Sequence, residues 1–272
     1  MTPGFSGDAA AGHGREPDAP PDGLPDAVAT WWREFATPTA DPARFDPIVL
    51  TDLPSPAARW LAHAIEPGAN LHRCALLRQR GRIKIGRWAP FRADWLLAPP
   101  HGFVWSATAR LGPVQVRGYD RYTDRTGEMR WRLFGRVPLI HAANADITRS
   151  SAGRLASEIC FIPTALLTLP VRWEPVDGQR AVALIPVGEW THRVTITVGE
   201  AGDLTRIELP RWGNPDGRKH HDHLFTAEPD EREITVDGLT IPMGAAGGWW
   251  HCTDGCAEEP FIRLTVEDAR YR

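Results

Sequence analysis

The residues best placed for chemistry are Arg154 and Glu158, which stand four positions apart in a segment predicted to be helical up to Pro163. Side chains at this spacing lie one turn apart on the same face of a helix and can form an ion pair. If the helix lies against a hollow, burial can move the pKa of Glu158 toward neutrality, as a proton-transferring group requires. Ion pairs that only hold a fold together have the same composition. The sequence therefore leaves two interpretations, a catalytic pair and a structural pair.

The loop Arg211–Gly217, of sequence RWGNPDG, is a second candidate. Its last four residues are typical of a tight turn, in which proline fixes its own φ and glycine accepts a positive φ. In a functional interpretation, Arg211 or Asp216 orients a polar group of a ligand, since binding residues concentrate on loops. The turn alone also explains the loop.

Potential metal ligands gather in two short segments. They are His221, His223, His251, Cys252 and Cys256. Zinc takes about four nitrogen or sulfur ligands, so a site could form only if the two segments meet. The sequence has neither a Cys-x-x-Cys knuckle nor the His-Glu-x-x-His pattern of a helical zinc site. We therefore predict no bound metal and interpret residues 220–223 as a solvated polar loop.

Tryptophans recur on or near the predicted strands, and each indole buries a large area while offering one N–H to a polar partner. Trp105 and Trp131 occupy apolar positions of alternating segments, so we expect both to face inward. Arg132, next to Trp131, and Trp250 are further candidates for ligand contact. Such side chains either fill a core or line a cavity that is apolar with a few placed polar groups.

The elements that must position these residues follow from hydrophobic periodicity. Residues 25–36, the segment from Ser55 to Pro67, and a segment capped by Ser150 or Ser151 have helical spacing. Segments with a two-residue repeat, clearest at 103–111, predict strands. They lie near 73–79, 82–87, 90–97, 103–111, 114–122, 129–133, 170–175, 180–186, 191–199, 203–210, 232–237, 239–242, 248–251 and 260–267. With turns at Gly81, Gly112 and Gly127, this pattern predicts a mainly β fold (α+β) with a long curved antiparallel sheet.

Composition bounds the class of protein. Residues 1–23 are rich in Gly, Pro, Ala and Asp and are expected to form a disordered tail, followed by one β-rich domain over 24–272. A net charge of −3 without basic blocks argues against nucleic acid as a partner. No stretch approaches the roughly 18 apolar residues of a membrane span, and no secretory signal precedes the domain. We therefore expect a cytoplasmic protein, and no phosphate-binding or dinucleotide-binding motif suggests a cofactor.

Several stretches resemble, in order, an uncharacterised bacterial family of unknown function. They are Leu77–Gly81 with Trp88–Phe91, Gly102–Trp105, Phe161–Leu167 (FIPTALL), Arg211–Gly217 (RWGNPDG), and Gly248–Trp250 with Asp268–Arg270. The resemblance runs from about residue 50 to the end. It implies a fold similar to the lipoprotein carriers LolA and LolB, in which a curved sheet forms an incomplete barrel around one or two helices and encloses an apolar cavity. One departure from the family pattern is the segment after Gly217, which reads RKHHDH instead of being aromatic and Gly-rich.

These observations support two functional hypotheses. The first is a protein that binds an apolar or lipid-like small molecule in the cavity of the curved sheet. The alternative is a cofactor-independent enzyme (a cyclase, isomerase or hydrolase) that acts on a hydrophobic biosynthetic substrate. There Glu158 would be the acid or base, and Arg154, Arg132 or Arg211 would stabilise negative charge. A structural protein would instead expose an apolar patch to a partner. The sequence does not identify the ligand or the oligomeric state.

Overall fold

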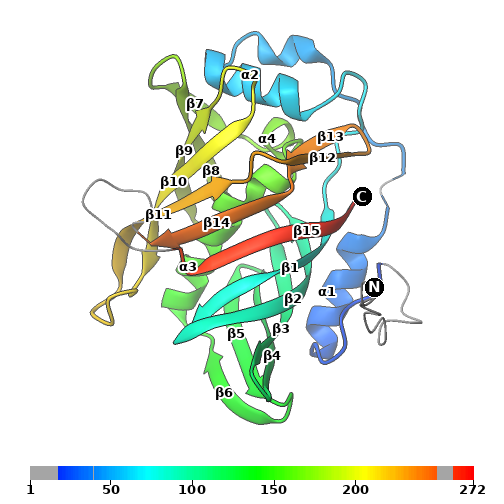
Figure 1. Cartoon of the computed structure of the whole chain (residues 1–272). Coiled ribbons are helices and arrows are strands. Elements are labelled where there is room, and N and C mark those ends of the chain that lie inside the picture. The colour runs from blue at the N-terminus through cyan, green and yellow to red at the C-terminus, as the bar shows by residue number, and fades with distance from the viewer. Residues whose placement is uncertain (1–17, 39, 250–259) are drawn as a thin grey trace, which may run out of the picture.

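The computed structural model describes residues 18–38, 40–249 and 260–272. Within these ranges, thirteen strands form one antiparallel sheet in the order β6-β5-β4-β3-β2-β1-β15-β14-β11-β10-β9-β8-β7 (Figure 1). The strands are β1 (Ala75–Ile85), β2 (Arg87–Ala98), β3 (Gly102–Leu111), β4 (Val114–Thr123), β5 (Thr126–Leu133), β6 (Val137–Ala142), β7 (Arg172–Pro175), β8 (Arg180–Val187), β9 (Trp190–Val198), β10 (Leu204–Gly213), β11 (His221–Pro229), β14 (Gly244–Trp249) and β15 (Ile262–Tyr271). A separate hairpin joins β12 (Glu233–Val236) to β13 (Leu239–Pro242). The predicted mainly β fold with a long curved antiparallel sheet is confirmed.

The sheet is made continuous by strands that are distant in sequence. Strands β1–β6 follow one another as a meander, and β7–β11 do the same. Strand β15 pairs with β1, where Ala75 lies opposite Tyr271, and β14 pairs with β11, where Phe225 lies opposite Trp249. The joined sheet curls around α3 (Ala145–Ser157), which lies on its concave side (Figure 1).

Strands β1 and β2 are buried on both faces, because successive side chains point to opposite faces and each face is covered. Leu76 and Leu96 pack under α1 (Asp26–Ala36), which covers the outer face with Trp31 and Trp32. Neighbouring residues such as Leu77 belong to the core on the concave side. The helix α2 (Ser55–Ala64), with the short turn η1 (Pro47–Leu50), covers the end of the barrel at β8, β9 and β13. No helix in the described ranges is long and apolar enough to cross a membrane.

Helix α3 begins earlier than the sequence predicted. Asn144 is its N-cap, and the Asn144 side chain accepts a hydrogen bond from the Ile147 amide at 2.9 Å, so Ser150 and Ser151 lie within the helix. The buried face of α3 contains the small residues Ala152 and Gly153, and Gly153 allows the side chain of Arg211 on β10 to approach. The chain continues through η2 (Glu158–Phe161) to α4 (Ala165–Thr168).

Three predicted features of the sheet are wrong. Gly127 is not in a turn but lies within β5, and the turn before it is at Asp124 and Arg125, with φ angles of 51° and 61°. Gly81 is not a turn but lies within the single strand β1, and the turn is at Gly86 with a φ of 70°. A Cβ at Gly81 would overlap the carbonyl oxygen of Arg263 on β15, so this glycine permits a close approach of two strands. Strand β11 was missed, because its first residues, His221 to His223, are polar and conceal the alternation that follows.

Contacts with the domain also begin before residue 24, where the composition placed the start of the domain. The Asp18 carboxylate forms ion pairs with Arg270 and Arg272, and the Asp18 carbonyl accepts a hydrogen bond from the Trp32 indole at 3.0 Å. Residues 18–23 thus lie against the domain because of these polar contacts. Residues 1–17, the rest of the predicted tail, lie outside the described residues.

Substituting Gly81→Ala is expected to destabilise the fold by about 1–3 kcal/mol, the usual cost of overpacking. The added methyl would displace the backbone of β15 at Arg263. Gly178→Ala is the matched control, since no atom lies within 4 Å of its added Cβ, and it should be neutral or stabilising by up to about 1 kcal/mol. Urea unfolding compares the two variants. Equal stabilities would show that β15 does not approach β1 as closely as described.

Candidate functional site

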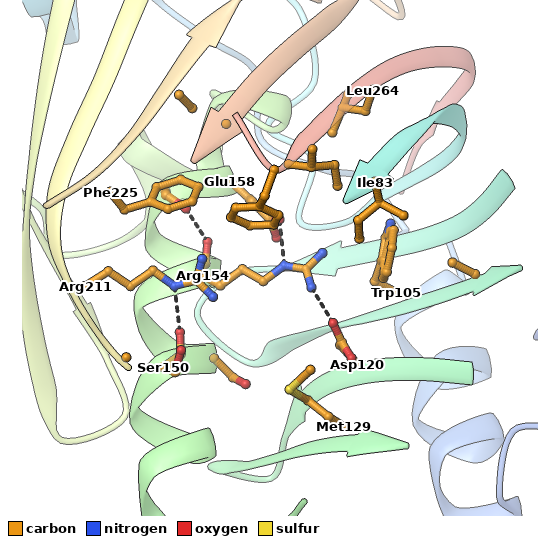
Figure 2. Close-up of a pocket in the computed structure, with 18 of the residues that line it drawn as sticks. Ile83, Trp105, Asp120, Met129, Ser150, Arg154, Glu158, Arg211, Phe225 and Leu264 are labelled. Carbon is orange, nitrogen blue, oxygen red and sulfur yellow. Dashed lines mark hydrogen bonds and ion pairs between the residues drawn. The ribbon is translucent and has the colours of Figure 1, made fainter. Parts of the chain in front are cut away.

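A cavity of about 430 Å³ lies between the concave face of the sheet and α3. This volume falls within the range of small-molecule sites, roughly 300–1,000 Å³. Most of the lining side chains are apolar, and many are aromatic (Figure 2). The aromatic ones are Phe91, Trp95, Trp105, Trp131, Phe161, Phe225, Trp249 and Phe261. Because native interiors hold few voids larger than a water molecule, the hollow is not an ordinary packing defect.

Arg154 holds two carboxylates at the wall of this cavity (Figure 2). Its Nε lies 2.8 Å from Oε1 of Glu158, and its Nη1 lies 3.0 Å from Oδ2 of Asp120. The indole of Trp131 donates to Oδ1 of Asp120 at 2.8 Å. The predicted pair of Arg154 and Glu158 is therefore present, as part of a larger cluster.

Burial dominates the electrostatics of this cluster. Burial raises the pKa of Glu158 and that of Asp120, and the nearby Arg154 charge opposes both shifts. Burial lowers the pKa of Arg154, but the two carboxylates outweigh it and raise that pKa above its ordinary value. The second oxygen of Glu158, Oε2, is covered and has no hydrogen-bond partner in the described structure. Glu158 therefore presents no free carboxylate oxygen to the cavity.

Arg211 enters the same cavity from β10. Its Nε donates to the carbonyl oxygen of Ser150 at 3.2 Å, and its guanidinium carbon lies 5.1 Å from the ring centroids of both Phe225 and Trp249. A Cβ at Gly153 would lie 3.2 Å from Cγ of Arg211, so this glycine in α3 makes room for the side chain. Burial, with a contribution from the Arg154 charge, lowers the pKa of Arg211 to about 10. The guanidinium is thus charged at neutral pH.

Trp105 and Trp131 both line the cavity, facing inward as their alternation predicts. Their ring centroids lie 5.8 Å apart, and Phe91 lies 5.5 Å from Trp105 on the other side. The Trp105 indole donates to Oε1 of Gln79 at 3.1 Å, and Gln79 is fully buried. The rings thus form a continuous aromatic wall with its polar atoms directed to specific partners.

Other predicted site residues lie elsewhere. Arg132 does not line the cavity among the described residues, because it follows Trp131 in β5 and so points to the opposite face. Asp216 is on the exposed loop beyond β10, where it accepts a hydrogen bond from the Arg218 amide at 3.1 Å. Trp250 lies outside the described residues.

The proposed metal ligands do not assemble in the described part of the chain. Residues 221–223 belong to strand β11 and do not form the predicted loop. The ring centroids of His221 and His223 lie 3.6 Å apart on this strand. His251, Cys252 and Cys256 lie outside the described residues. Among the described residues, no group of three or more His, Cys, Asp or Glu could hold a metal ion.

Asp120 and Gln79 were not predicted as site residues from the sequence, although the alternation of side chains along β4 indicates that Asp120 faces inward. Val116 and Tyr122 of β4 are buried in the concave-side core, and Asp120 shares their parity in the strand. An acid on the apolar face of a strand is costly without a partner, so it marks a paired or functional position. Arg211 follows the same rule, because it shares the parity of Ile207 and Leu209 in β10.

Comparison with known proteins places the chain in a family. It is similar to solved structures of a LolA superfamily protein from Nitrosomonas europaea (13% identity, 80% of this chain and 92% of that chain, TM-score 0.39) and a proposed outer membrane lipoprotein-sorting protein domain from Vibrio parahaemolyticus (11%, 73% and 85%, 0.39). A third is a DUF1329 family protein from Desulfovibrio piger (10%, 74% and 86%, 0.33). No curated protein matches the chain by sequence. The model of a family of unknown function, DUF6544, matches residues 43–261, and the chain therefore belongs to that family.

Proposed function

We propose that this protein binds an apolar small molecule in the cavity between the curved sheet and α3. The observation that carries the proposal is the hollow itself, about 430 Å³ in volume and lined by aromatic and aliphatic side chains with a few polar groups. Removing apolar ligand surface from water contributes about 0.8 kcal/mol for each buried methylene group. A chain of several methylenes can therefore bind by burial alone.

The alternative function, a cofactor-independent enzyme, depends on Glu158 as the acid or base. A raised pKa on a buried carboxyl favours that role. However, Oε1 of Glu158 is held by Arg154 and Oε2 is covered, so neither oxygen faces a substrate. A general acid or base must come within hydrogen-bond distance of the proton that it transfers. The geometry therefore supports binding better than catalysis.

The cavity should be blocked by Ala227→Phe, because Ala227 lines it from β11 and is only half-buried. The test is a titration with a dibrominated stearic acid or its methyl ester, whose bromines quench the cavity tryptophans on contact. We expect the variant to weaken binding by about tenfold or more, since excluding two methylenes from the site exceeds 1.4 kcal/mol.

Ala201→Phe, in the exposed turn between β9 and β10, is the matched control and should bind like the wild type. The proposal fails if neither probe quenches the wild-type fluorescence up to its solubility limit. It also fails if Ala227→Phe, shown to be folded by circular dichroism, binds with unchanged affinity.

A further inference from the structure

The two arginines in the cavity differ in how their charges are compensated. Arg154 is held by Asp120 and Glu158, each within 3.0 Å. Arg211 makes no ion pair within the described ranges, and its one hydrogen bond there runs from Nε to a backbone carbonyl. Its two terminal nitrogens have no hydrogen-bond partner in the described ranges, yet they are not covered by protein atoms. Because Arg211 lines the cavity, they are open to it. Arg211 thus offers free donors inside an apolar hollow.

The surroundings of Arg211 hold these donors in a fixed position. The guanidinium lies against the rings of Phe225 and Trp249, whose centroids are 5.6 Å apart, and such cation–π contacts contribute about 0.5–2 kcal/mol. Gly213 makes room for this arrangement, because a Cβ there would come within 2.7 Å of the Trp249 ring. A side chain fixed by two rings and a hydrogen bond is preorganised for a ligand, which reduces the entropy lost on binding.

A buried cation without a direct ion-pair partner has lost hydration that no contacting anion replaces, so this position favours an anion that arrives from outside. The acids that act on Arg211 through space are Asp120 and Glu158, and both already accept hydrogen bonds from Arg154. Arg154 is one cation for two carboxylates, so the remaining negative charge acts on Arg211 only through space, and no carboxylate pairs with its guanidinium directly within the described ranges. A guanidinium with two free terminal nitrogens matches the planar oxygens of a carboxylate or the oxygens of a phosphate.

We propose that the ligand is an anionic amphiphile, whose carboxylate or phosphate group binds to Arg211 while its apolar body lies along the wall formed by Phe91, Trp105 and Trp131. The inference rests on the proposed function and specifies its ligand class. In this arrangement Arg211 recognises the charged group of the ligand, and the aromatic wall buries the apolar body of the ligand.

The experiment compares ligands of one chain length: tetradecanoate, tetradecyl phosphate, tetradecanol and methyl tetradecanoate. Each competes with the dibrominated ester, and recovery of tryptophan fluorescence gives its affinity. We expect the wild type to bind at least one anion roughly 10- to 100-fold more tightly than the two neutral ligands, the range for a hydrogen bond to a charged group. Arg211→Gln should remove this preference and leave the affinity for the neutral ligands within about twofold.

Arg132→Gln is the matched control, because it removes a nearby arginine that does not line the cavity, and it should keep the preference for anions. Equal binding of all four ligands by the wild type would overturn this inference while leaving the proposed function intact. A preference that survives in Arg211→Gln would do the same. Binding of none of them would overturn both. The wild-type comparison decides the question even if Arg211→Gln does not fold.

Discussion

Substituting Arg154→Met is expected to destabilise the protein by about 3–5 kcal/mol at pH 7, the usual cost of removing one partner from a buried ion pair. The substitution leaves the carboxylates of Asp120 and Glu158 at the cavity wall without their shared cation. Their side chains are only 14% and 18% exposed, so water can compensate little of this loss. Chemical denaturation at pH 7 measures the effect directly.

The loss caused by Arg154→Met should decrease as the pH falls. Burial already raises the pKa of Asp120 and Glu158 above their ordinary values of 3.8 and 4.5, and removing Arg154 takes away the charge that opposes this shift. A carboxyl with a raised folded-state pKa contributes stability below its unfolded pKa and loses it as pH rises through the folded value. The variant should therefore approach the wild type in stability as the pH is lowered from 7 toward about 4.5.

Arg193→Met is the matched control, because it breaks an exposed, solvent-screened ion pair to Glu174 and should change stability far less than Arg154→Met at either pH. Combining Arg154→Met with Asp120→Asn and Glu158→Gln should recover a large part of the stability, since neither carboxylate is then left charged without Arg154. A loss no greater than that of Arg193→Met, with no dependence on pH, would mean that the three charges are well solvated.

Trp105→Ala is expected to cost about 3–5 kcal/mol, the range for deleting a buried indole and leaving a cavity. Trp105 is 3% exposed, packs between Phe91 and Trp131, and gives Oε1 of Gln79 its hydrogen bond. Nε2 of Gln79 already has no partner in the described structure, so the variant would leave the whole buried amide unsatisfied. Thermal and urea unfolding measure this loss.

Phe134→Ala is the control for Trp105→Ala, because its ring is 57% exposed and its removal should change stability by less than about 0.5 kcal/mol. If Trp105→Ala were equally mild, the aromatic wall would be a flexible lining rather than part of the packed core.

Local patterns in the sequence were enough to predict most of the fold. Two-residue alternation predicted the strands around Trp105 and Trp131, and four-residue spacing predicted the pair of Arg154 and Glu158. The predictions that failed concern features that depend on distant segments or on a single side chain. The role of Gly81 is set by β15, nearly two hundred positions away, and the start of α3 depends on the Asn144 cap.

The candidate site was predicted only in part for the same reason. Asp120 reaches Arg154 because β4 crosses beside α3, which no local pattern encodes. Arg211 was predicted as a member of a loop, whereas it is the third residue from the end of β10 and points into the cavity. Hydrophobic alternation does mark both residues, as charges at positions where apolar side chains are expected.

The most direct test of the account is a crystal structure of the protein grown with a dibrominated stearic acid, in which the bromines are located by their anomalous scattering. Bromine is expected inside the cavity, against Trp105, Trp131 and Phe225, with the carboxylate at Arg211. A cavity without bromine at a saturating concentration of the acid, or bromine bound solely on the outer surface, would contradict it.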